Sequence, residues 1–193
     1  TGGFGITYIA FDKRLEVPVA IKELFVVNKV KREIRKTVLM DTTENGIQQY
    51  QELKRRFMQE AKTMAELENV EGVVKVKDYF QENNTAYIVM EYLDGKTLKE
   101  LVREGKKKMS VSQAVTLFEP IMHSLSKMHK VGIIHRDISL DNIMITKDHR
   151  VKLIDLGGEK RLGNYSKTDR TAIIKKSVYT PVEQILGKSN DIG

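Results

Sequence analysis

The residues of this chain that could do chemistry gather in a short polar run, HRDISLDN (135–142), which interrupts two apolar, strand-like stretches. The run holds a histidine, an arginine, two carboxylates and an amide, and a further acid, Asp155, follows in LIDLGG. Such residue types serve in proton transfer and in the binding of hard cations. Each also has a plainer explanation, since His135 could be a core histidine and Asp155 could cap a turn.

A second group of candidates lies near the start of the chain. The glycine cluster TGGFG (1–5) allows backbone N–H groups to approach phosphates because no side chain intrudes. Lys22 follows on a predicted strand, where alternation places it on the same face as Ala20, with Val19 and Ile21 on the other face. The alternatives are that the glycine cluster forms an ordinary turn and that Lys22 is a surface lysine.

The third candidate is a glutamate within an apolar helical stripe. Phe57, Glu60, Met64 and Leu67 fall on one side of a predicted helix. A carboxylate held against a core needs a cation or carries a large desolvation cost. Glu60 therefore requires a partner, either a distant cation or Arg56 one turn earlier.

The elements that must position these residues divide into two parts. In the first part, the sequence pattern predicts strands at 6–11, 17–24, 73–79 and 85–92 and a helix at about 48–67. Residues 25–47 have no clear period and are interpreted as an inserted excursion of uncertain structure. EYLDG then breaks the sheet.

The second part is mainly helical. A short helix is predicted at TLKELVRE and a long one at SVSQAVTLFEPIMHSLSKMH, with Pro120 expected to kink it and Gly132 to stop it. Short strands are expected at IMIT and VKLIDLGG. The predicted core stripe of the long helix consists of Val115, Phe118, Met122, Leu125 and His129.

Composition limits the function classes. The chain has 193 residues, of which 40% are hydrophobic and 31% charged, as in a soluble globular protein. It contains no apolar run of about 18 residues for a membrane helix, no signal peptide pattern and no cysteine. The net charge is +7, but the lysines are dispersed, so we expect no nucleic-acid binding. Since Thr1 opens directly into the glycine cluster, we expect a fragment.

In order, the motifs form one series: GGFG, VAIK, a helix glutamate, HRDISLDN, DLG and PVE. This series resembles the protein-kinase signature set, and six matches in order argue against chance. The opening GGFGITY is similar to the bacterial branch of eukaryotic-like serine/threonine kinases. The resemblance covers the chain except for residues 25–47.

The resemblance implies an α+β, two-lobed protein-kinase-like fold. It has a five-stranded antiparallel sheet with one helix in the N-lobe (1–90), a hinge (91–95) and an incomplete, mainly helical C-lobe (96–193). The implied activity is transfer of the γ-phosphoryl group of ATP to Ser or Thr hydroxyls of proteins, with ATP and Mg²⁺ as cofactors.

The resemblance also assigns roles to the catalytic candidates. Lys22 would bind the α- and β-phosphates, and Glu60 would fix its position. Asp137 would accept or orient the proton of the substrate hydroxyl, and Asn142 and Asp155 would bind the metal.

Other family positions would bind the nucleotide. Thr7, Ala20 and Met144 match the residues that sandwich adenine, and Met90 matches the gate of the back pocket. The full set of expected binding residues, besides Lys22, is Gly2, Gly3, Phe4, Gly5, Thr7, Ala20, Met90, Glu91, Tyr92, Leu93 and Met144.

Arg136 precedes the proposed base. In kinases with that arginine, a phosphorylated residue of the activation segment often pairs with it and orders the loop. The candidates here are Ser166, Thr168, Thr171 and Ser177.

The chain departs from the kinase pattern in several places. DLG replaces DFG, PVE replaces APE, and the first glycine of the motif would precede Thr1. The largest departure is Ser139, where serine/threonine kinases usually have a lysine; Asp141 occupies the position at which tyrosine kinases have an arginine. We expect Lys175 or Lys176 to supply the cation.

Two other functions stay open. A pseudokinase would bind a nucleotide or partner without transfer, and a small-molecule phosphotransferase of related fold would lack the PVE region. For a kinase we expect a Ser- or Thr-containing protein substrate, no membrane contact within this segment and room for an autophosphorylating dimer. We expect a cytoplasmic location, with any membrane tether in parts beyond this segment.

Overall fold

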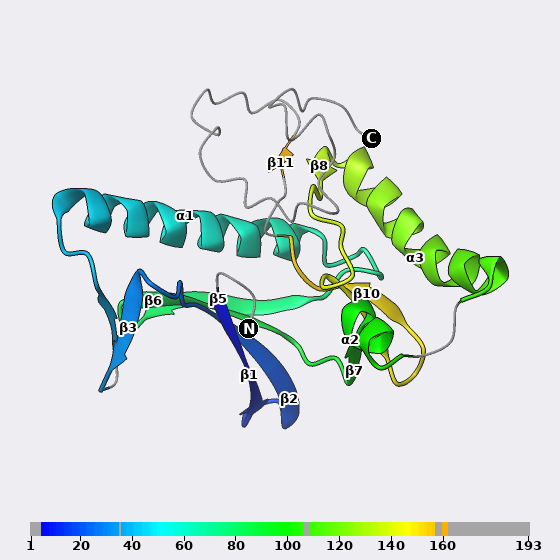
Figure 1. Cartoon of the computed structure of the whole chain (residues 1–193), viewed down its shortest axis with the longest axis horizontal. Helices are drawn as coiled ribbons and strands as arrows, with labels where there is room; N and C mark the ends of the chain where they lie inside the picture. Colours follow the sequence, from blue (N-terminus) through cyan, green and yellow to red (C-terminus); the bar gives the residue numbers. More distant parts are fainter. Residues whose placement is uncertain (1–4, 35, 106–108, 157–159, 162–193) are drawn as a thin grey trace. The chain divides into compact units, whose positions relative to one another are not determined.

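The computed structural model describes residues 5–34, 36–105, 109–156 and 160–161. The chain forms two compact units, one with residues 1–68 and 74–93 and the other with 69–73 and 94–193. Residues 69–73, which we expected in the first part, belong to the second unit. Figure 1 shows the elements in sequence colours.

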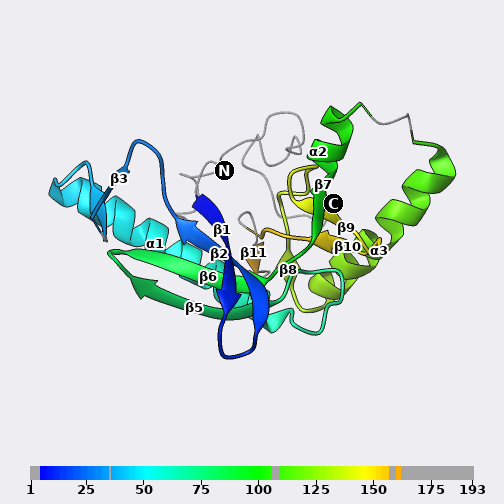
Figure 2. The same ribbon diagram turned by 90° about the horizontal axis from the view of Figure 1, so that it is seen from below.

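The first unit is built on an antiparallel sheet with the strand order β1-β2-β6-β5 (Figure 2). The strands are β1 (Gly5–Asp12), β2 (Val17–Leu24), β5 (Val76–Glu82) and β6 (Thr85–Glu91). Among the described residues the sheet has four strands, one fewer than the five expected.

Turn chemistry sets the registers of this sheet. Asp12 accepts hydrogen bonds from the N–H groups of Arg14 and Leu15 at 2.8 and 3.0 Å, which closes the β1–β2 turn. Asn83 and Asn84 join β5 to β6 with φ of 52° and 60°. Two consecutive left-handed residues match the right-handed twist of a hairpin, and asparagine tolerates that conformation.

The excursion at 25–47 contains ordered structure that the sequence did not predict. β3 (Val30–Glu33) and β4 (Lys36–Leu39) pair as a hairpin, and α1 (Glu44–Glu66) follows directly. The helix begins before the predicted residue 48 because Thr43 is its N-cap and accepts a hydrogen bond from the N–H of Gly46 at 3.2 Å. The stretch TTENG is therefore a helix start rather than the end of a loop.

α1 packs against β5 and β6 through its apolar stripe. Phe57, Glu60, Met64 and Leu67 are all buried, as predicted. In Figure 1 the helix runs along the sheet of the first unit. Of the helices among the described residues, none has the length and apolar character needed to cross a bilayer.

The second unit combines two helices with short strands: β7 (Gly95–Thr97), α2 (Leu98–Arg103), α3 (Val111–Lys130), β8 (Ile133–Ile134), β9 (Ile143–Thr146), β10 (Val151–Leu153) and β11 (Lys160–Arg161). The strands pair in the orders β10-β9-β7 and β11-β8. Both predicted helices and the strands at IMIT and VKL are confirmed; β7 was not predicted. Gly132, with φ +77°, follows the end of α3 as expected.

The predicted core stripe of α3 is wrong at three of its five positions, while Leu125 and His129 are half-buried. Val115, Phe118 and Met122 are exposed, and the buried residues of the helix are Ile121, Ser124 and Met128. Ser124 approaches the segment 69–73 closely, since a Cβ on Gly72 would lie 2.0 Å from the Ser124 hydroxyl. The helix therefore turns its other face to its own unit.

Candidate active site

Lys22 on β2 and Glu60 on α1 form an ion pair, with Nζ 2.8 Å from Oε1. Their side chains are 15% and 10% exposed, and the Lys22 ammonium lies 5.6 Å from the centroid of the Phe57 ring. Arg56, the alternative partner, instead donates to Glu52 at 2.8 Å. The cation that Glu60 requires is thus the distant strand lysine, as predicted.

The other nucleotide-binding candidates of the first unit lie along paired strands. Thr7 is opposite Lys22, and Ala20 is opposite Met90. Gly5 lies close to the β2 backbone, since a Cβ there would be 2.6 Å from the carbonyl oxygen of Glu23, so no side chain fits without movement. Gly2, Gly3 and Phe4 lie outside the described residues.

The connector begins where the sheet of the first unit ends. Glu91 exchanges two hydrogen bonds with the backbone of Lys75, one from its own N–H and one to its carboxylate, both at 2.9 Å. Leu93 is buried, and Tyr92 is half-buried. Glu91 is the last residue of β6 and lies opposite Val19, whereas Tyr92 and Leu93 follow the end of that strand.

In the second unit, the segment 135–137 has a constrained backbone. Arg136 has φ +62°, a left-handed conformation that costs a non-glycine residue about 1 to 2 kcal/mol. His135 is buried, and its Nδ1 accepts a hydrogen bond from the N–H of Asp137 at 3.3 Å. The histidine therefore organises the loop, in agreement with its expected packing role.

Asn142 holds Asp137 in place. Its side-chain Nδ2 donates to the Asp137 carbonyl oxygen at 2.8 Å and to the carboxylate Oδ2 at 2.9 Å. Its N–H donates to the Ser139 carbonyl at 3.0 Å, and its own carbonyl accepts from the N–H of Ile154 at 3.0 Å. The last bond ties the loop to the residue that precedes Asp155.

These residues fit a hard cation. Because Nδ2 of Asn142 is engaged with Asp137, the amide presents its oxygen, and Asp155 adds a half-buried carboxylate in the same unit. Within the described ranges, no group of three or more His, Asp or Glu side chains could hold a metal alone. Two oxygen ligands suit Mg²⁺, which takes the rest of its coordination from water and phosphate.

Met144 and Ser139 occupy defined positions in the second unit. Met144 lies on β9 opposite Lys152 and Thr97. Ser139 is 3% exposed, so the position where a kinase usually carries a lysine is buried and neutral here. Lys175 and Lys176, the expected substitutes, lie outside the described residues, as do the four phosphorylation candidates and the PVE segment.

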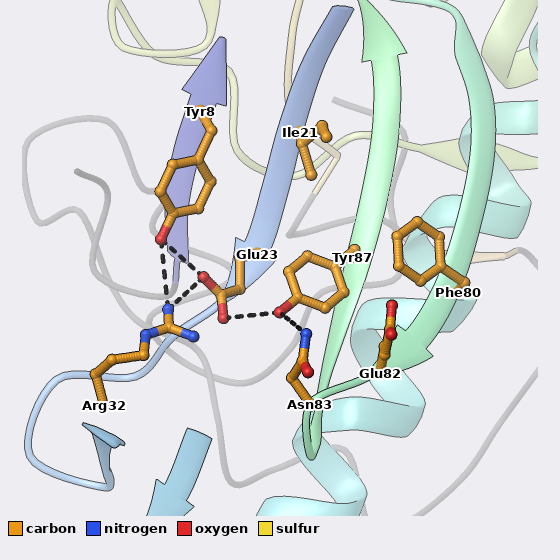
Figure 3. A pocket seen from close by; sticks show the side chains of 8 residues that line it. All are labelled: Tyr8, Ile21, Glu23, Arg32, Phe80, Glu82, Asn83 and Tyr87. Atoms are coloured by element: carbon orange, nitrogen blue, oxygen red, sulfur yellow. Dashed lines mark hydrogen bonds and ion pairs between the residues drawn. The ribbon is translucent and has the colours of Figure 1, made fainter. Parts of the chain in front are cut away.

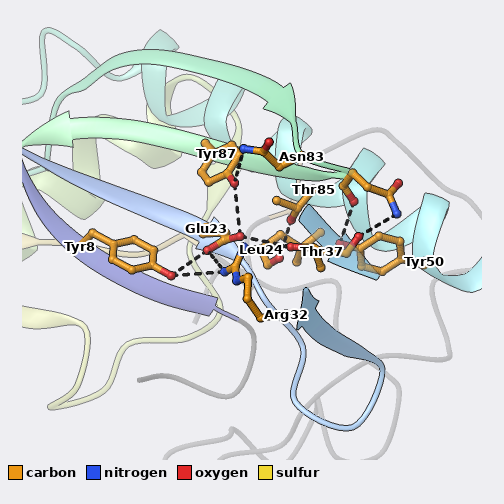
Figure 4. A network of polar contacts seen from close by, with 10 residues as sticks. Tyr8, Glu23, Leu24, Arg32, Thr37, Tyr50, Asn83, Thr85 and Tyr87 are labelled. Atoms are coloured by element: carbon orange, nitrogen blue, oxygen red, sulfur yellow. Dashed lines mark hydrogen bonds and ion pairs between the residues drawn. The ribbon is translucent and has the colours of Figure 1, made fainter. Parts of the chain in front are cut away.

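A buried carboxylate, Glu23, was missed by the sequence reasoning (Figure 4). It is 1% exposed and accepts hydrogen bonds from Arg32 at 2.5 Å, Tyr8 at 2.9 Å and Tyr87 at 3.4 Å. Burial works to raise the pKa of Glu23, but the hydrogen bonds from Arg32 and the tyrosines outweigh it and lower that pKa. The sequence pattern that could have identified Glu23 is strand alternation, which places this acid on the same face of the strand as the apolar Val19.

A pocket of about 380 Å³ lies beside this network on the first unit (Figure 3). Three of its eight lining residues are aromatic, and two of these, Phe80 and Tyr87, stack with their ring centroids 5.1 Å apart. The lining residues are Tyr8, Ile21, Glu23, Arg32, Phe80, Glu82, Asn83 and Tyr87. None of the predicted site residues lines it, so this pocket is separate from the expected nucleotide-binding positions.

Comparison with known proteins gives a consistent family. A family profile described as protein kinase domain matches residues 1–193. A probable serine/threonine-protein kinase of Streptomyces coelicolor is 32% identical over 98% of this chain and 26% of its own length. Serine/threonine-protein kinase PknL of Mycobacterium tuberculosis is 31% identical over 96% of this chain and 41% of its own length.

Among solved structures, one described as the apo form of PpkA-294 is similar, with a TM-score of 0.76 and 34% identity. The match covers 81% of this chain and 55% of that one. The present chain spans 26% and 41% of the length of these two curated relatives.

Proposed function

Because this chain belongs to the protein kinase family, we propose that it transfers the γ-phosphoryl group of ATP to serine or threonine hydroxyls of proteins. The observation that carries the proposal is the contact between Asn142 and the Asp137 carboxylate at 2.9 Å. It fixes one carboxylate in one orientation, as a residue that receives a proton during transfer must be fixed.

In the proposed reaction, the first unit supplies the cation for the nucleotide phosphates. Lys22, held by Glu60 at 2.8 Å, would contact the α- and β-phosphates. Because both side chains are largely shielded from water, the ammonium keeps one position and its charge is weakly screened. The backbone N–H groups of residues 2–5 would approach the phosphates, and Thr7 and Ala20 would contact the base.

The second unit supplies the proton acceptor and the metal ligands. The substrate oxygen forms a bond to the γ-phosphorus, the bond from that phosphorus to the leaving oxygen of ADP breaks, and Asp137 receives the hydroxyl proton. Asn142 and Asp155 would hold Mg²⁺, which when bound neutralises charge on the phosphate oxygens. Arg136 would pair with a phosphorylated residue of the activation segment.

One observation favours a second candidate function. Ser139 is buried and cannot place an ammonium near the transferred group, so the chain could bind a nucleotide as a pseudokinase. Retention of Lys22, Asp137, Asn142 and Asp155 favours transfer. We propose cytoplasmic action on protein substrates, with a dimer as the arrangement for autophosphorylation.

A transfer assay with radiolabelled ATP, Mg²⁺ and a basic Ser/Thr protein substrate tests the proposal. We expect label on serine or threonine, and its loss in Asp137→Asn with nucleotide binding retained. Lys22→Met should lose both transfer and nucleotide affinity. Equal labelling by wild type and Asp137→Asn would contradict kinase activity, and nucleotide binding without labelling would favour the pseudokinase.

A further inference from the structure

The first turn of α2 is fastened to the loop 137–142 through Lys99. The N–H of Lys99 donates to the Leu140 carbonyl at 3.0 Å. Its Nζ reaches both carboxylate oxygens of Asp141, at 2.7 Å to Oδ1 and 3.0 Å to Oδ2. A capping box between Thr97 and Glu100 fixes this end of the helix, so Lys99 has a defined starting point.

The residue that Lys99 holds is adjacent to the amide that orients the carboxylate. Asn142 follows Asp141 directly, and donates to Asp137 at 2.8 and 2.9 Å. On its other side Asn142 accepts from Ile154 at 3.0 Å. The C-terminal end of the loop is thus tied to α2 through Leu140 and Asp141, and to the segment before Asp155 through Asn142.

We propose that Lys99 is a positioning residue for phosphoryl transfer, acting through Asp141 on Asn142 and so on Asp137. The inference rests on the proposed kinase function and deepens it. Ser139 offers this loop no charge, whereas Lys99 brings an ammonium from the neighbouring helix. Nothing in the kinase motifs of the sequence marks Lys99, because its relation to the loop depends on how α2 packs.

The expected effect is moderate because the side chains of Lys99 and Asp141 are 43% and 36% exposed. Solvent weakens such pairs, so loss of the contact should lower kcat by about threefold. Because Asn142 is also a proposed metal ligand, the Mg²⁺ concentration for half-maximal activity should rise by a similar factor. The KM for ATP should change little, since Lys99 is not among the residues expected to bind the base.

The experiment compares Lys99→Met, Asp141→Asn, the double variant and Lys99→Arg in the whole chain. Lys96→Met is the matched control, because Lys96 pairs with exposed Glu104 away from the loop. We expect both single variants to show the fall in kcat and the shift in Mg²⁺ dependence, the double variant to be no worse, and arginine to restore most activity. Lys96→Met should match wild type.

Amide hydrogen exchange gives a readout that does not need activity. Lys99→Met should speed exchange of the Asn142 and Ile154 N–H groups, while Lys96→Met should not. If wild type transfers no phosphate, the proposed function fails, and exchange alone still decides whether Lys99 braces the loop. Unchanged exchange, or a Lys99→Met variant with the kcat and Mg²⁺ dependence of Lys96→Met, would overturn the inference.

Discussion

Neutralising Glu60 tests the reasoning about the buried ion pair most directly. Glu60→Gln keeps the shape of the side chain and a hydrogen-bond acceptor but removes the negative charge from its pair with Lys22. Both side chains are at most 15% exposed, so the energetic effect of breaking this pair should lie between that of an exposed ion pair and that of a fully buried one. Exposed pairs are worth about 0.5 kcal/mol, and breaking a fully buried pair costs about 3 to 5 kcal/mol. We expect a loss of about 2 kcal/mol in the free energy of unfolding.

The assay is urea unfolding followed by circular dichroism, with Glu52→Gln as the control. Glu52 lies on the same helix but is 41% exposed, and it pairs with Arg55 and Arg56. Because Glu52 makes two such exposed pairs, its neutralisation should cost at most about 1 kcal/mol. Adding Lys22→Met to Glu60→Gln should cost less than the sum of the single changes, because the two groups interact.

The kinase assay gives a second measure of the same change. Without the charge of Glu60 the Lys22 ammonium is held less firmly in its position, so kcat/KM for ATP should fall by about tenfold, about 1.4 kcal/mol. If Glu60→Gln destabilised the protein no more than Glu52→Gln does, the claim that burial makes this pair strong would be refuted.

Three further changes test other parts of the structure. Arg32→Met leaves Glu23 buried without its cation and should cost about 2 kcal/mol in urea unfolding at pH 7. Because the pKa of Glu23 is lowered in the folded state, its ionised carboxylate stabilises the wild type above about pH 4.5, and this stabilisation is lost as pH falls through the folded-state pKa. The variant lacks most of this stabilisation and should therefore lose less stability on acidification. Gly95→Ala would place a Cβ 2.2 Å from the Ile145 carbonyl oxygen, so it should lower the free energy of unfolding by more than 2 kcal/mol, measured by thermal melting. The control is Gly105→Ala, which should cost about 1 kcal/mol because the space there is open but φ is +67°. Thr43→Ala should cost about 1 kcal/mol and some helical circular dichroism signal, with Thr43→Ser close to wild type.

The ion pair of the first unit was predictable because two rules agreed. Helical periodicity placed Glu60 between Phe57 and Met64, and a carboxylate in that position requires a cation. The motif order then named Lys22. This part of the site depends on local pattern and on charge, both of which a sequence carries directly.

The buried face of α3 was not predictable in the same way. Apolar residues form two neighbouring stripes on this helix, and periodicity identifies stripes without saying which one packs. Met122 is 67% exposed and Met128 is 0% exposed, although both are equally apolar. The choice is made by the elements that pack against the helix, here β8 and β10.

The Glu23 network shows a second limit of the sequence. Glu23 and Arg32 lie on different elements, and the pairing exists only because the β3–β4 hairpin folds back on the sheet. No period or motif in residues 25–47 signals that hairpin. Polar partners that are chosen by tertiary structure leave little trace in a single sequence.

The assignment of residues 69–73 to the second unit has a consequence for synthesis. Val73 forms a parallel bridge with Leu153, and Leu153 donates to the Gly72 carbonyl at 2.8 Å. When the ribosome has added Leu93, every residue of the first unit exists, yet this short stretch must wait for a strand that has not been translated. The sheet of the first unit can therefore form before residues 69–73 have their partner strand. A chain that ended at residue 93 would lack the contacts of Gly72 and Val73 with Leu153.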